Sequence, residues 1–183
     1  MNQNNIHTNS GYNFYVAVSM EELKAAMRCW ATGVTVVTAF HDGVRHGMTV
    51  SSFTSVSLTP PMVLISLERT TRTRQFVTAS GFFGVNLLGS TQEELSNRFA
   101  GRISDLENRF EDLDAFVLES GAPMLADALA WMDCRVSAVY EVSTHSIIVG
   151  EVIGVKAFAS QSENLQPLIY YDRGYRALQG KAG

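Results

Sequence analysis

The chain has 183 residues, of which 46% are hydrophobic and 17% are charged, and this length and composition fit one globular domain with one sizeable core. Lys and Arg number 14 and Asp and Glu number 18, so the formal net charge is −4. A mildly acidic chain has no general attraction for nucleic acid or for an anionic membrane, so any anion site must be built locally from a few basic groups.

The N-terminal residues predict a flexible tail rather than a targeting segment. Residues 1–14 are polar, with neither a basic start nor an apolar run, and a single domain is expected over 15–183. No apolar run approaches the roughly 20 residues of a membrane helix. Cys29 and Cys134 lack CxxC spacing and are expected to be buried free thiols. We therefore expect a cytoplasmic protein with no nucleic-acid or membrane partner.

The first elements in the chain are a helix and three strands. Ser19 and Glu22 have capping-box spacing, which predicts a helix that ends near Gly33. Apolar residues recur at helical spacing at Leu23, Met27 and Trp30. The expected strands are residues 33–40, then residues 44–58 after the hairpin signal "HDG", then residues 62–68 after two prolines. The last of these is apolar nearly throughout, so it is expected to be buried on both faces.

The second half of the chain continues the alternation of short helices and strands. Residues 70–81 predict a helix ended by Gly81, and residues 82–89 predict a strand. Residues 90–101 predict a second helix, opened by Ser90 and Glu93 at capping-box spacing. Residues 101–122 are charged and predicted irregular. Two or three long antiparallel strands are expected over 128–158, with a turn near residues 143 and 144, and an aromatic strand pair over 167–178.

This element pattern predicts a mainly β fold with flanking helices. Strands outnumber helices, and strands that follow one another look hairpin-connected. The regular βαβ alternation of a parallel sheet is missing. The pattern favours a single-domain antiparallel barrel with a few helices packed outside.

The motifs of several enzyme classes are missing from the sequence. It contains no GxGxxG dinucleotide fingerprint, no GxxxxGK[ST] phosphate loop, no GxSxG elbow and no HExxH zinc motif. The four histidines, at positions 7, 41, 46 and 145, are scattered. We therefore predict no catalytic nucleophile, acid or base, and no metal site.

Residues 46–61, "HGMTVSSFTSVSLTPP", carry an unusual number of hydroxyls between apolar neighbours. If this is one strand, Thr49, Ser51 and Phe53 share a face, and alternate residues face the other way. Short hydroxyls and exposed amides would hydrogen-bond the carbonyl and imide edge of a flavin ring. The alternative is an edge strand whose hydroxyls face water, and the pattern alone leaves both open.

A basic hydroxyl-rich segment, "RTTRTR" at residues 69–74, follows the third strand. Hydroxyls, guanidiniums and the first amides of a helix together make a phosphate site. The alternative is a solvated basic helix start. A ring site on one strand and a phosphate site after the next support each other.

Five stretches occur in the order typical of the flavin reductase family, which the sequence resembles. They are "WATGVTVVTAF", "HGMTVSSFTSVSLTPP", "GVNLLGSTQEELSNRFAG", "THSIIVGEV" and "PLIYYDRGY", and they span roughly residues 20–178. The resemblance implies an FMN-binding split β-barrel that binds FMN or FAD and works as a homodimer. It also implies a reductase component that supplies reduced flavin to an oxygenase in a two-component monooxygenase system.

The resemblance also implies site residues. Those implied to contact flavin are Gly47, Met48, Thr49, Val50, Ser51, Ser52 and Phe53 at the ring and ribityl chain, Glu68, Arg69, Thr73 and Arg74 at the phosphate end, and Asn86, Leu87, Leu88, Phe99 and Ala100 around the cofactor. Those implied to face NAD(P)H are His145, Tyr171, Arg173 and Tyr175. The chain departs from close relatives at Ser51, where they often have Asn, at Thr144, where they have a carboxylate, and at residues 171–174, which are often glycine-rich in relatives.

The implied chemistry is hydride transfer from a dihydronicotinamide to flavin N5. It requires alignment rather than a nucleophile or a strong acid or base, which accounts for the missing catalytic motifs. NADH is the expected donor, with NADPH as the alternative. Two rival functions are a non-catalytic split barrel that holds flavin or haem, and an oxidase of pyridoxamine phosphate on a related barrel.

Overall fold

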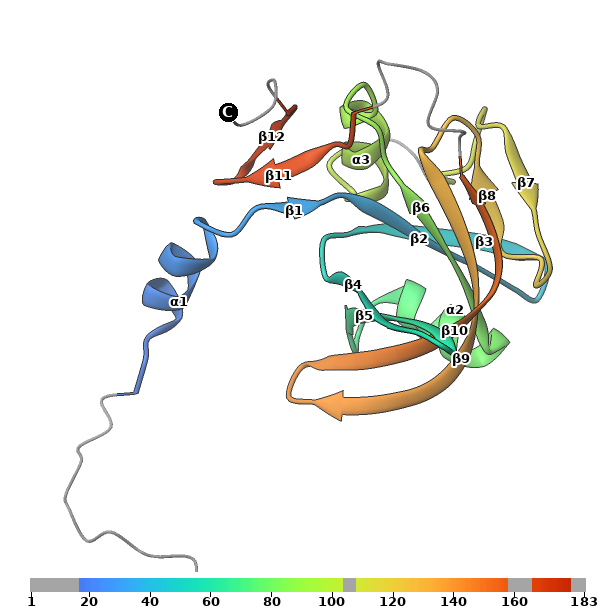
Figure 1. The fold of residues 1–183 in the computed structure, drawn as a ribbon, viewed down its shortest axis with the longest axis horizontal. Helices are drawn as coiled ribbons and strands as arrows, with labels where there is room; N and C mark the ends of the chain where they lie inside the picture. Colours follow the sequence, from blue (N-terminus) through green and yellow to red (C-terminus); the bar gives the residue numbers. More distant parts are fainter. Residues whose placement is uncertain (1–16, 104–107, 158–165, 179–183) are drawn as a thin grey trace, which may run out of the picture.

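The structure is a computed structural model that describes residues 17–103, 108–157 and 166–178 (Figure 1). The predicted tail, 1–14, lies outside the described residues. The chain is mainly β, with three helices in the described part and a curved antiparallel sheet at its centre. This confirms the predicted fold class.

Helix α1 (Met20–Met27) stands away from the rest of the molecule (Figure 1). The capping box predicted at its start is present: Glu22 N donates to Ser19 Oγ at 3.2 Å, and Ser19 N donates to Glu22 Oε2 at 2.8 Å. The helix ends at Met27 rather than near Gly33, which lies in the short strand β1 (Thr32–Gly33). No residue of α1 is buried, so its apolar residues face solvent.

The central sheet has seven strands in the order β3-β2-β6-β9-β10-β5-β4, and every pairing within it is antiparallel. The strands are β2 (Thr35–His41), β3 (Val44–Val50), β4 (Phe53–Leu58), β5 (Pro61–Glu68), β6 (Phe82–Leu87), β9 (Ala130–Val142) and β10 (His145–Ala157). The order ends at β3 on one side and at β4 on the other, so the barrel is not closed. This is the predicted split barrel.

The stretch 44–58 is two strands and not the single long strand that its composition predicts. β3 ends at Val50, which pairs with Thr35 of β2, and β4 begins at Phe53, which pairs with Ile65 of β5. The chain therefore crosses from one edge of the sheet to the other through a bend at Ser51 and Ser52. Side-chain alternation does not carry across a bend, so a single strand is not what groups residues 49, 51 and 53.

β5 is also less buried than predicted. Val63, Ile65 and Leu67 are buried, whereas Leu64 and Ser66, which point the other way, are only partly covered. A strand with one open face lines a cavity or the solvent, and the prediction that β5 is buried on both faces is therefore wrong.

The two helices that pack on the sheet begin differently from one another. α2 (Arg72–Ser80) is capped by Thr71 and ends at Gly81, whose φ of 77° is the left-handed conformation expected for a terminating glycine. α3 (Glu93–Phe99) begins after Gln92 without a side-chain cap, so the capping box predicted for Ser90 and Glu93 is wrong. The Gln92 side chain instead accepts a hydrogen bond from the Gly89 amide at 2.8 Å.

Two small hairpins complete the fold. β7 (Ala115–Val117) pairs with β8 (Pro123–Leu125), so part of the segment 101–122 predicted to be irregular is a strand. The predicted aromatic pair is present as β11 (Ile169–Tyr171) and β12 (Gly174–Arg176), and β11 also pairs with β1. The long hairpin of β9 and β10 turns at residues 143 and 144, as predicted.

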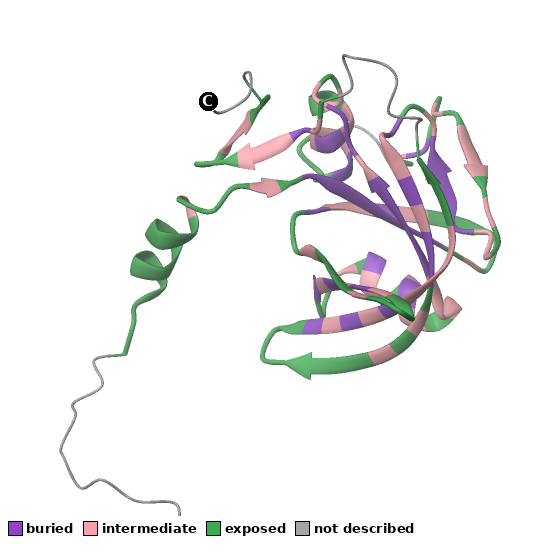
Figure 2. Ribbon diagram, viewed as in Figure 1, coloured by how far each residue is buried: buried purple, intermediate pink, exposed green. Residues whose placement is uncertain are grey.

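The core lies on the inner side of the sheet, where fully buried side chains gather (Figure 2). Cys134 is buried there as predicted, but Cys29 is exposed because it follows the unpacked helix α1. Among the described residues, no helix is both long and apolar enough to cross a membrane.

Candidate functional site

One cavity, which we call the main cavity, has a volume of about 650 Å³ and is lined by the β3–β4 bend and by parts of several strands. Its lining residues are Trp30, Ala31, Thr32, Gly33, Val34, Thr35, Ser51, Ser52, Phe53, Thr54, Leu64, Ser66, Leu87, Leu88, Leu129, Ile147, Pro167 and Leu168. It therefore unites the β3–β4 bend with β1, β5, the end of β6 and β10. Roughly 300–1,000 Å³ is the usual size of a small-molecule site.

The cavity combines an apolar wall with a hydroxyl-bearing edge. Leu64, Leu87 and Ile147 are among the apolar lining residues, and the hydroxyls come from the bend and from Ser66. Ser52 Oγ donates to Ser66 O at 2.6 Å, and Ser66 N donates to Ser52 O at 3.2 Å, so these bonds tie the bend to β5. The Ser51 hydroxyl forms no hydrogen bond among the described residues and lies at the cavity edge. A flat ring with polar atoms on one side suits such a surface.

A smaller hollow of about 200 Å³ adjoins the main cavity and shares Val34 and Ser51 with it. Its other lining residues are Thr49, Ser96, Ala100, Arg102, Tyr170 and Tyr175. Thr49 Oγ1 donates to Ser96 O at 2.6 Å. Tyr175 Oη lies 2.8 Å from Ser96 Oγ and donates to Asn97 Oδ1 at 3.1 Å, so the β12 hairpin is fastened to α3 at this hollow.

The structure thus brings eight of the expected flavin and nicotinamide residues to the two connected spaces. They are Ser51, Ser52, Phe53, Leu87 and Leu88 at the main cavity and Thr49, Ala100 and Tyr175 at the hollow. The sequence reasoning did not single out Ser66, Tyr170 or Arg102. Ser66 had a visible signal, because it is the one hydroxyl in an otherwise apolar strand.

Five other expected residues lie in the protein interior and do not line these spaces. Gly47, Val50, Asn86 and Phe99 are buried, and Met48 packs against the core. A Cβ at Gly47 would lie 3.0 Å from Phe99 Cε1 and 3.1 Å from Val37 O, so a side chain there would make tight contacts. Asn86 Nδ2 donates to Val36 O at 2.9 Å and its Oδ1 accepts from Leu125 N at 2.7 Å. Its amide is therefore occupied by backbone bonds.

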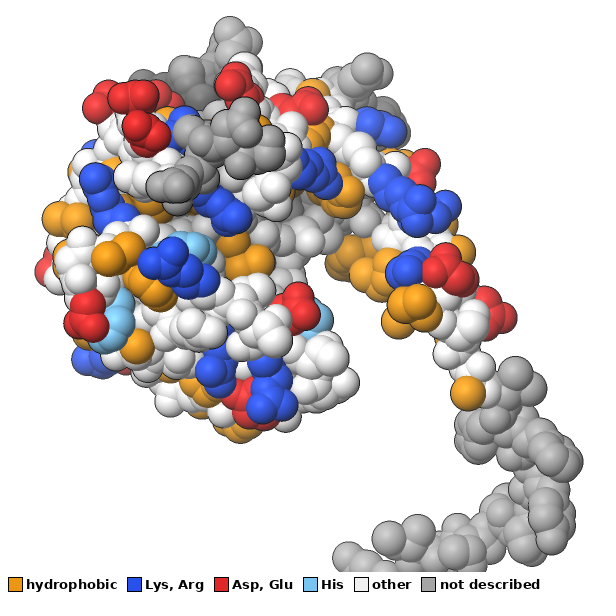
Figure 3. Space-filling view, turned by 180° about the vertical axis from the view of Figure 1, so that it is seen from behind, with side chains coloured by type: hydrophobic (Ala, Val, Ile, Leu, Met, Phe, Trp, Pro, Cys, Tyr) orange, Lys and Arg blue, Asp and Glu red, His pale blue; other side chains and the backbone are white. Residues whose placement is uncertain are grey.

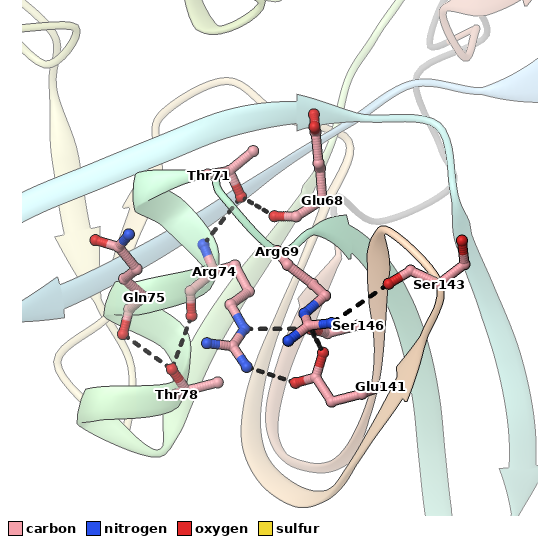
Figure 4. Close-up of polar contacts among 9 residues, drawn as sticks. All are labelled: Glu68, Arg69, Thr71, Arg74, Gln75, Thr78, Glu141, Ser143 and Ser146. Atoms are coloured by element: carbon pink, nitrogen blue, oxygen red, sulfur yellow. Dashed lines mark hydrogen bonds and ion pairs between the residues drawn. The ribbon is translucent and has the colours of Figure 1, made fainter.

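The basic segment at the start of α2 is organised around one carboxylate (Figure 4). Arg69 Nε lies 2.9 Å from Glu141 Oε2, and Arg74 Nη2 lies 2.5 Å from Glu141 Oε1. Arg74 Nε also donates to Ser146 Oγ at 3.2 Å. Although partial burial raises the pKa of Glu141, the hydrogen bonds from Arg74 and Ser146 and the charges of both arginines hold that pKa below its usual range.

The remaining residues of this segment point in different directions. Thr73 is buried, and its Oγ1 lies 2.9 Å from His46 Nδ1, so this hydroxyl faces the interior. The Glu68 carbonyl accepts from Thr71 Oγ1 at 2.7 Å. Arg69 and Arg74 thus lie together on Glu141 (Figure 4). Thr73 contacts His46 instead.

The expected nicotinamide residues are divided between two places. His145 is exposed at the start of β10, where its Nδ1 lies 2.9 Å from Thr144 Oγ1. It is two residues before Ile147, which lines the main cavity, and alternate residues of a strand share a face. Tyr171 and Arg173 are exposed at the β11–β12 turn and line neither space.

Among the described residues, no group of three or more His, Cys, Asp or Glu side chains could hold a metal ion. The cavity and the hollow offer a ring-sized apolar surface and hydroxyl and amide hydrogen-bonding groups, and the arginine pair on Glu141 lines neither space. These are the features of a split-barrel protein that binds an organic cofactor and aligns it.

The chain belongs to the flavin reductase family: the family model described as "Flavin reductase like domain" matches residues 27–179. It is 37% identical over 164 residues to the NADH-dependent flavin reductase StyB of Pseudomonas fluorescens, and the match covers 87% of this chain and 92% of that protein. It is also 39% identical over 163 residues to a flavin reductase homologue of Rhizobium meliloti (strain 1021), of which the match spans only 50%.

Solved structures agree with this assignment. The NADH:FAD oxidoreductase SgcE6 of Streptomyces globisporus C-1027, in complex with NAD and FAD fragments, superposes with a TM-score of 0.79 at 33% identity. The match covers 89% of this chain and 94% of that one. Flavin reductase PheA2 superposes with a TM-score of 0.80 at 32% identity, covering 89% of this chain and all of the other.

Proposed function

We propose that this protein is an NAD(P)H-dependent flavin reductase that passes a hydride to FMN or FAD and supplies the reduced flavin to a partner monooxygenase. The observation that carries the proposal is the main cavity, which has an apolar wall and a hydroxyl-bearing edge. The chain that forms this cavity is a member of the flavin reductase family. One relative, at 39% identity, is the reductase component of a 4-nitrophenol monooxygenase from Rhodococcus opacus.

The residues of the cavity fit a flavin. Leu64, Leu87 and Ile147 would pack on the faces of the ring, since apolar side chains there are only partly covered by the protein itself. The β3–β4 bend would hydrogen-bond the polar edge of the ring through its amides and the Ser51 hydroxyl. Arg69 and Arg74 would face the phosphate end of the flavin, where the phosphate and Glu141 would share the guanidinium donors.

Bound flavin supplies the electron-accepting chemistry, and the chain supplies position. The lining residues named above would exclude water from the ring faces and fix the orientation of the ring, which is what a direct hydride transfer requires. Tyr175, which lines the hollow, and His145, two residues before the cavity-lining Ile147, would orient the dihydronicotinamide by stacking or hydrogen bonding. No side chain has to gain or lose a proton during this transfer.

The direct test mixes the purified protein with each donor, NADH or NADPH, and each flavin, FMN or FAD, and follows the absorbance band of the reduced nicotinamide. We expect turnover with NADH and at least one flavin, and the four combinations rank the preferences. Flat traces in all four would instead favour a non-catalytic binding module. Oxidation of pyridoxamine phosphate without a nicotinamide would favour an oxidase.

A homodimer is part of this proposal. Leu23, Met27 and Trp30 are 57%, 55% and 65% exposed, and no residue of α1 is buried. A helix with such an uncovered apolar side is normally covered by a partner, and a second copy of the chain is the partner we propose. Because Trp30 also lines the main cavity, a dimer contact at this helix would lie next to the site.

The cytoplasm is the compartment we propose. Cys29 and Cys134 are both free thiols, and Cys29 is exposed. An exposed thiol persists most readily in a reducing compartment.

A further inference from the structure

A third pocket, which we call the basic pocket, shares no lining residue with the main cavity or the hollow. It has a volume of about 480 Å³ and is lined by Val44, Arg45, His46, Gly47, Arg72, Asn108, Arg109 and Phe110. Its residues come from the start of β3, the first residue of α2 and the segment that follows α3. Basic side chains and histidines are visible on the face of the molecule shown in Figure 3.

The three arginines of the basic pocket carry charges that no described carboxylate compensates. No Asp or Glu lines the pocket, and Arg45, Arg72 and Arg109 form no ion pair within the described residues. This contrasts with Arg69 and Arg74, a few residues away in sequence, which both pair with Glu141. In a chain of net charge −4, three guanidiniums that surround one pocket without a carboxylate among its described lining residues favour an anion.

The arginines are held in place by groups that leave their charge intact. Arg109 Nη1 donates to Gly47 O at 3.1 Å and to Phe99 O at 2.9 Å. The Arg45 guanidinium lies 5.6 Å from the centre of the Phe110 ring, and that of Arg72 lies 5.2 Å from the centre of the Phe76 ring. Carbonyl and ring contacts orient a guanidinium without neutralising it, and Arg109, which is partly buried, is fixed more firmly than the exposed Arg45 and Arg72.

His46 adds a neutral imidazole to this set. Its Nδ1 is occupied by the Thr73 hydroxyl at 2.9 Å, and its ring packs 5.4 Å from that of Phe76. Burial, and then the charges of Arg109 and Arg72, lower the pKa of His46 to about 4. The imidazole is therefore neutral at pH 7, and Nε2 forms no bond to any described residue.

We propose that the basic pocket binds a phosphate group at a site separate from the flavin. Guanidiniums present paired donors that match a phosphate, and the imidazole Nε2 can supply another. The pocket is larger than a phosphate ion alone, so it admits the phosphate of a nucleotide as well as free inorganic phosphate. Neither the proposed hydride transfer nor the flavin fit uses any of these side chains.

The test uses His46 as a reporter of the bound anion. The full-length protein is titrated with inorganic phosphate while sodium chloride keeps the ionic strength constant, and the pKa of the His46 ring is followed by NMR. The His46 signal is identified by its loss in His46→Gln. A phosphate beside the ring stabilises its protonated form, so we expect a saturable rise in its pKa of about one unit or more.

Variants test whether the change in the His46 pKa comes from phosphate bound in the basic pocket. Arg45→Gln and Arg72→Gln are each expected to weaken phosphate binding about tenfold, the usual effect of losing one charge-assisted hydrogen bond. Arg135→Gln is the matched control, because Arg135 is an exposed arginine that pairs with Glu151 and lines none of the pockets described above. A His46 pKa that phosphate leaves unchanged, or a non-saturating response equal in all variants, would overturn the proposal.

Further titrations distinguish a nucleotide phosphate from free inorganic phosphate. Tighter binding of 5′-AMP or adenosine 2′,5′-diphosphate than of inorganic phosphate assigns the pocket to a nucleotide, and equal binding assigns it to the free oxyanion. Saturation with FMN beforehand is expected to leave phosphate binding intact. If FMN displaces phosphate, the pocket belongs to the flavin, and the inference of a separate site is wrong.

Discussion

Glu141 is shared by two guanidiniums at the place where the phosphate end of a flavin is proposed. Its two oxygens contact Arg69 and Arg74 at 2.9 Å and 2.5 Å. Because a carboxylate and a phosphate compete for the same donors, Glu141 both positions the arginines and limits their attraction for an anion. A flavin that must be released to a partner needs moderate affinity, and this arrangement would provide it.

Two substitutions at this network are expected to change flavin affinity in opposite directions. Arg69→Ala removes a guanidinium and should weaken FMN binding by about fivefold to tenfold, whereas Glu141→Gln frees both arginines and should strengthen it by a similar factor. Quenching of flavin fluorescence measures both. Arg135→Gln, far from this network in the sheet, is the control. Equal FMN affinity in Arg69→Ala and in the unchanged protein would contradict the phosphate assignment.

His46 is expected to make stability depend on pH. Its pKa of about 4 in the folded chain lies below the usual 6.5, so between these values the unfolded chain binds a proton that the folded chain does not. Stability should therefore fall as the pH is lowered through this window. Going from about pH 7.5 to about pH 5 should cost about 1–2 kcal/mol, after allowance for the partial exposure of the ring.

Urea unfolding in phosphate-free buffer measures this dependence, with His46→Gln as the comparison. The variant should lose the part of the pH dependence that lies between about pH 6.5 and pH 4. The contribution of Glu141, whose pKa is lowered from 4.5, is lost at lower pH and should remain in the variant. Identical pH profiles for the two proteins would exclude His46 as the cause.

Among the elements, the close packing of β6, β9 and β10 supports the wall behind the site. A Cβ at Gly150 of β10 would lie 2.5 Å from Phe83 Cζ and 3.1 Å from Cys134 Cβ, so the strand passes directly over the Phe83 ring. The β9–β10 register shifts between Val149 and Gly150, next to this contact. β10 continues from there to Ile147 at the main cavity, so the glycine helps to set the position of that wall.

Gly150→Ala is therefore expected to destabilise the fold. The added methyl group must displace a fully buried ring, which typically costs about 1–3 kcal/mol. Gly154→Ala is the matched control in the same strand, because its nearest atom would be the flexible Glu119 Cγ at 3.3 Å. Thermal unfolding should give a lower melting temperature for Gly150→Ala than for Gly154→Ala. Equal melting temperatures would show that the Phe83 ring can move to accommodate the methyl group.

Local signals in the sequence predicted most elements, and they failed where a contact distant in sequence decides the structure. The Ser19 capping box, the Gly81 terminator and the turn at residues 143 and 144 depend on neighbouring residues and were confirmed. The bend at Ser51 and Ser52 depends on β3 and β4 pairing with different strands, which composition does not encode.

At the candidate site too, signals from neighbouring residues were predictive, and contacts between residues distant in sequence were not predicted. The hydroxyls of residues 49, 51 and 52 were predicted from their density, and they do line the cavity and the hollow. Glu141 was not predicted as a partner of the arginines, because it is 67 residues from Arg74 and the two meet only through the fold. The basic pocket was missed for this reason too, since Arg45, Arg72 and Arg109 come from three separate segments.

At the scale of the whole molecule, a well-packed barrel carries an uncovered helix, α1. The capping box shows that the helix is locally well formed, yet none of its residues is buried, and it stands away from the barrel (Figure 1). Isolated helices of this length are marginal in water, so the helix requires a covering surface to persist. The proposed second copy would both stabilise α1 and place a protein surface beside Trp30 at the main cavity.

Leu23→Glu should therefore weaken the dimer without disturbing the barrel. Leu23 lies on the apolar side of α1 with Met20 and Met27, and a charge placed there would have to be buried in the interface, whereas in the monomer it faces water. Sedimentation velocity should show a dimer that dissociates at least about tenfold more readily in the variant. Ala25→Glu, on the opposite side of the same helix, is the control and should remain dimeric, because its charge stays in solvent.

Circular dichroism of both variants checks that the barrel is intact. A monomeric unchanged protein, or equal dimerisation of the two variants, would mean that a partner other than a second copy covers this helix.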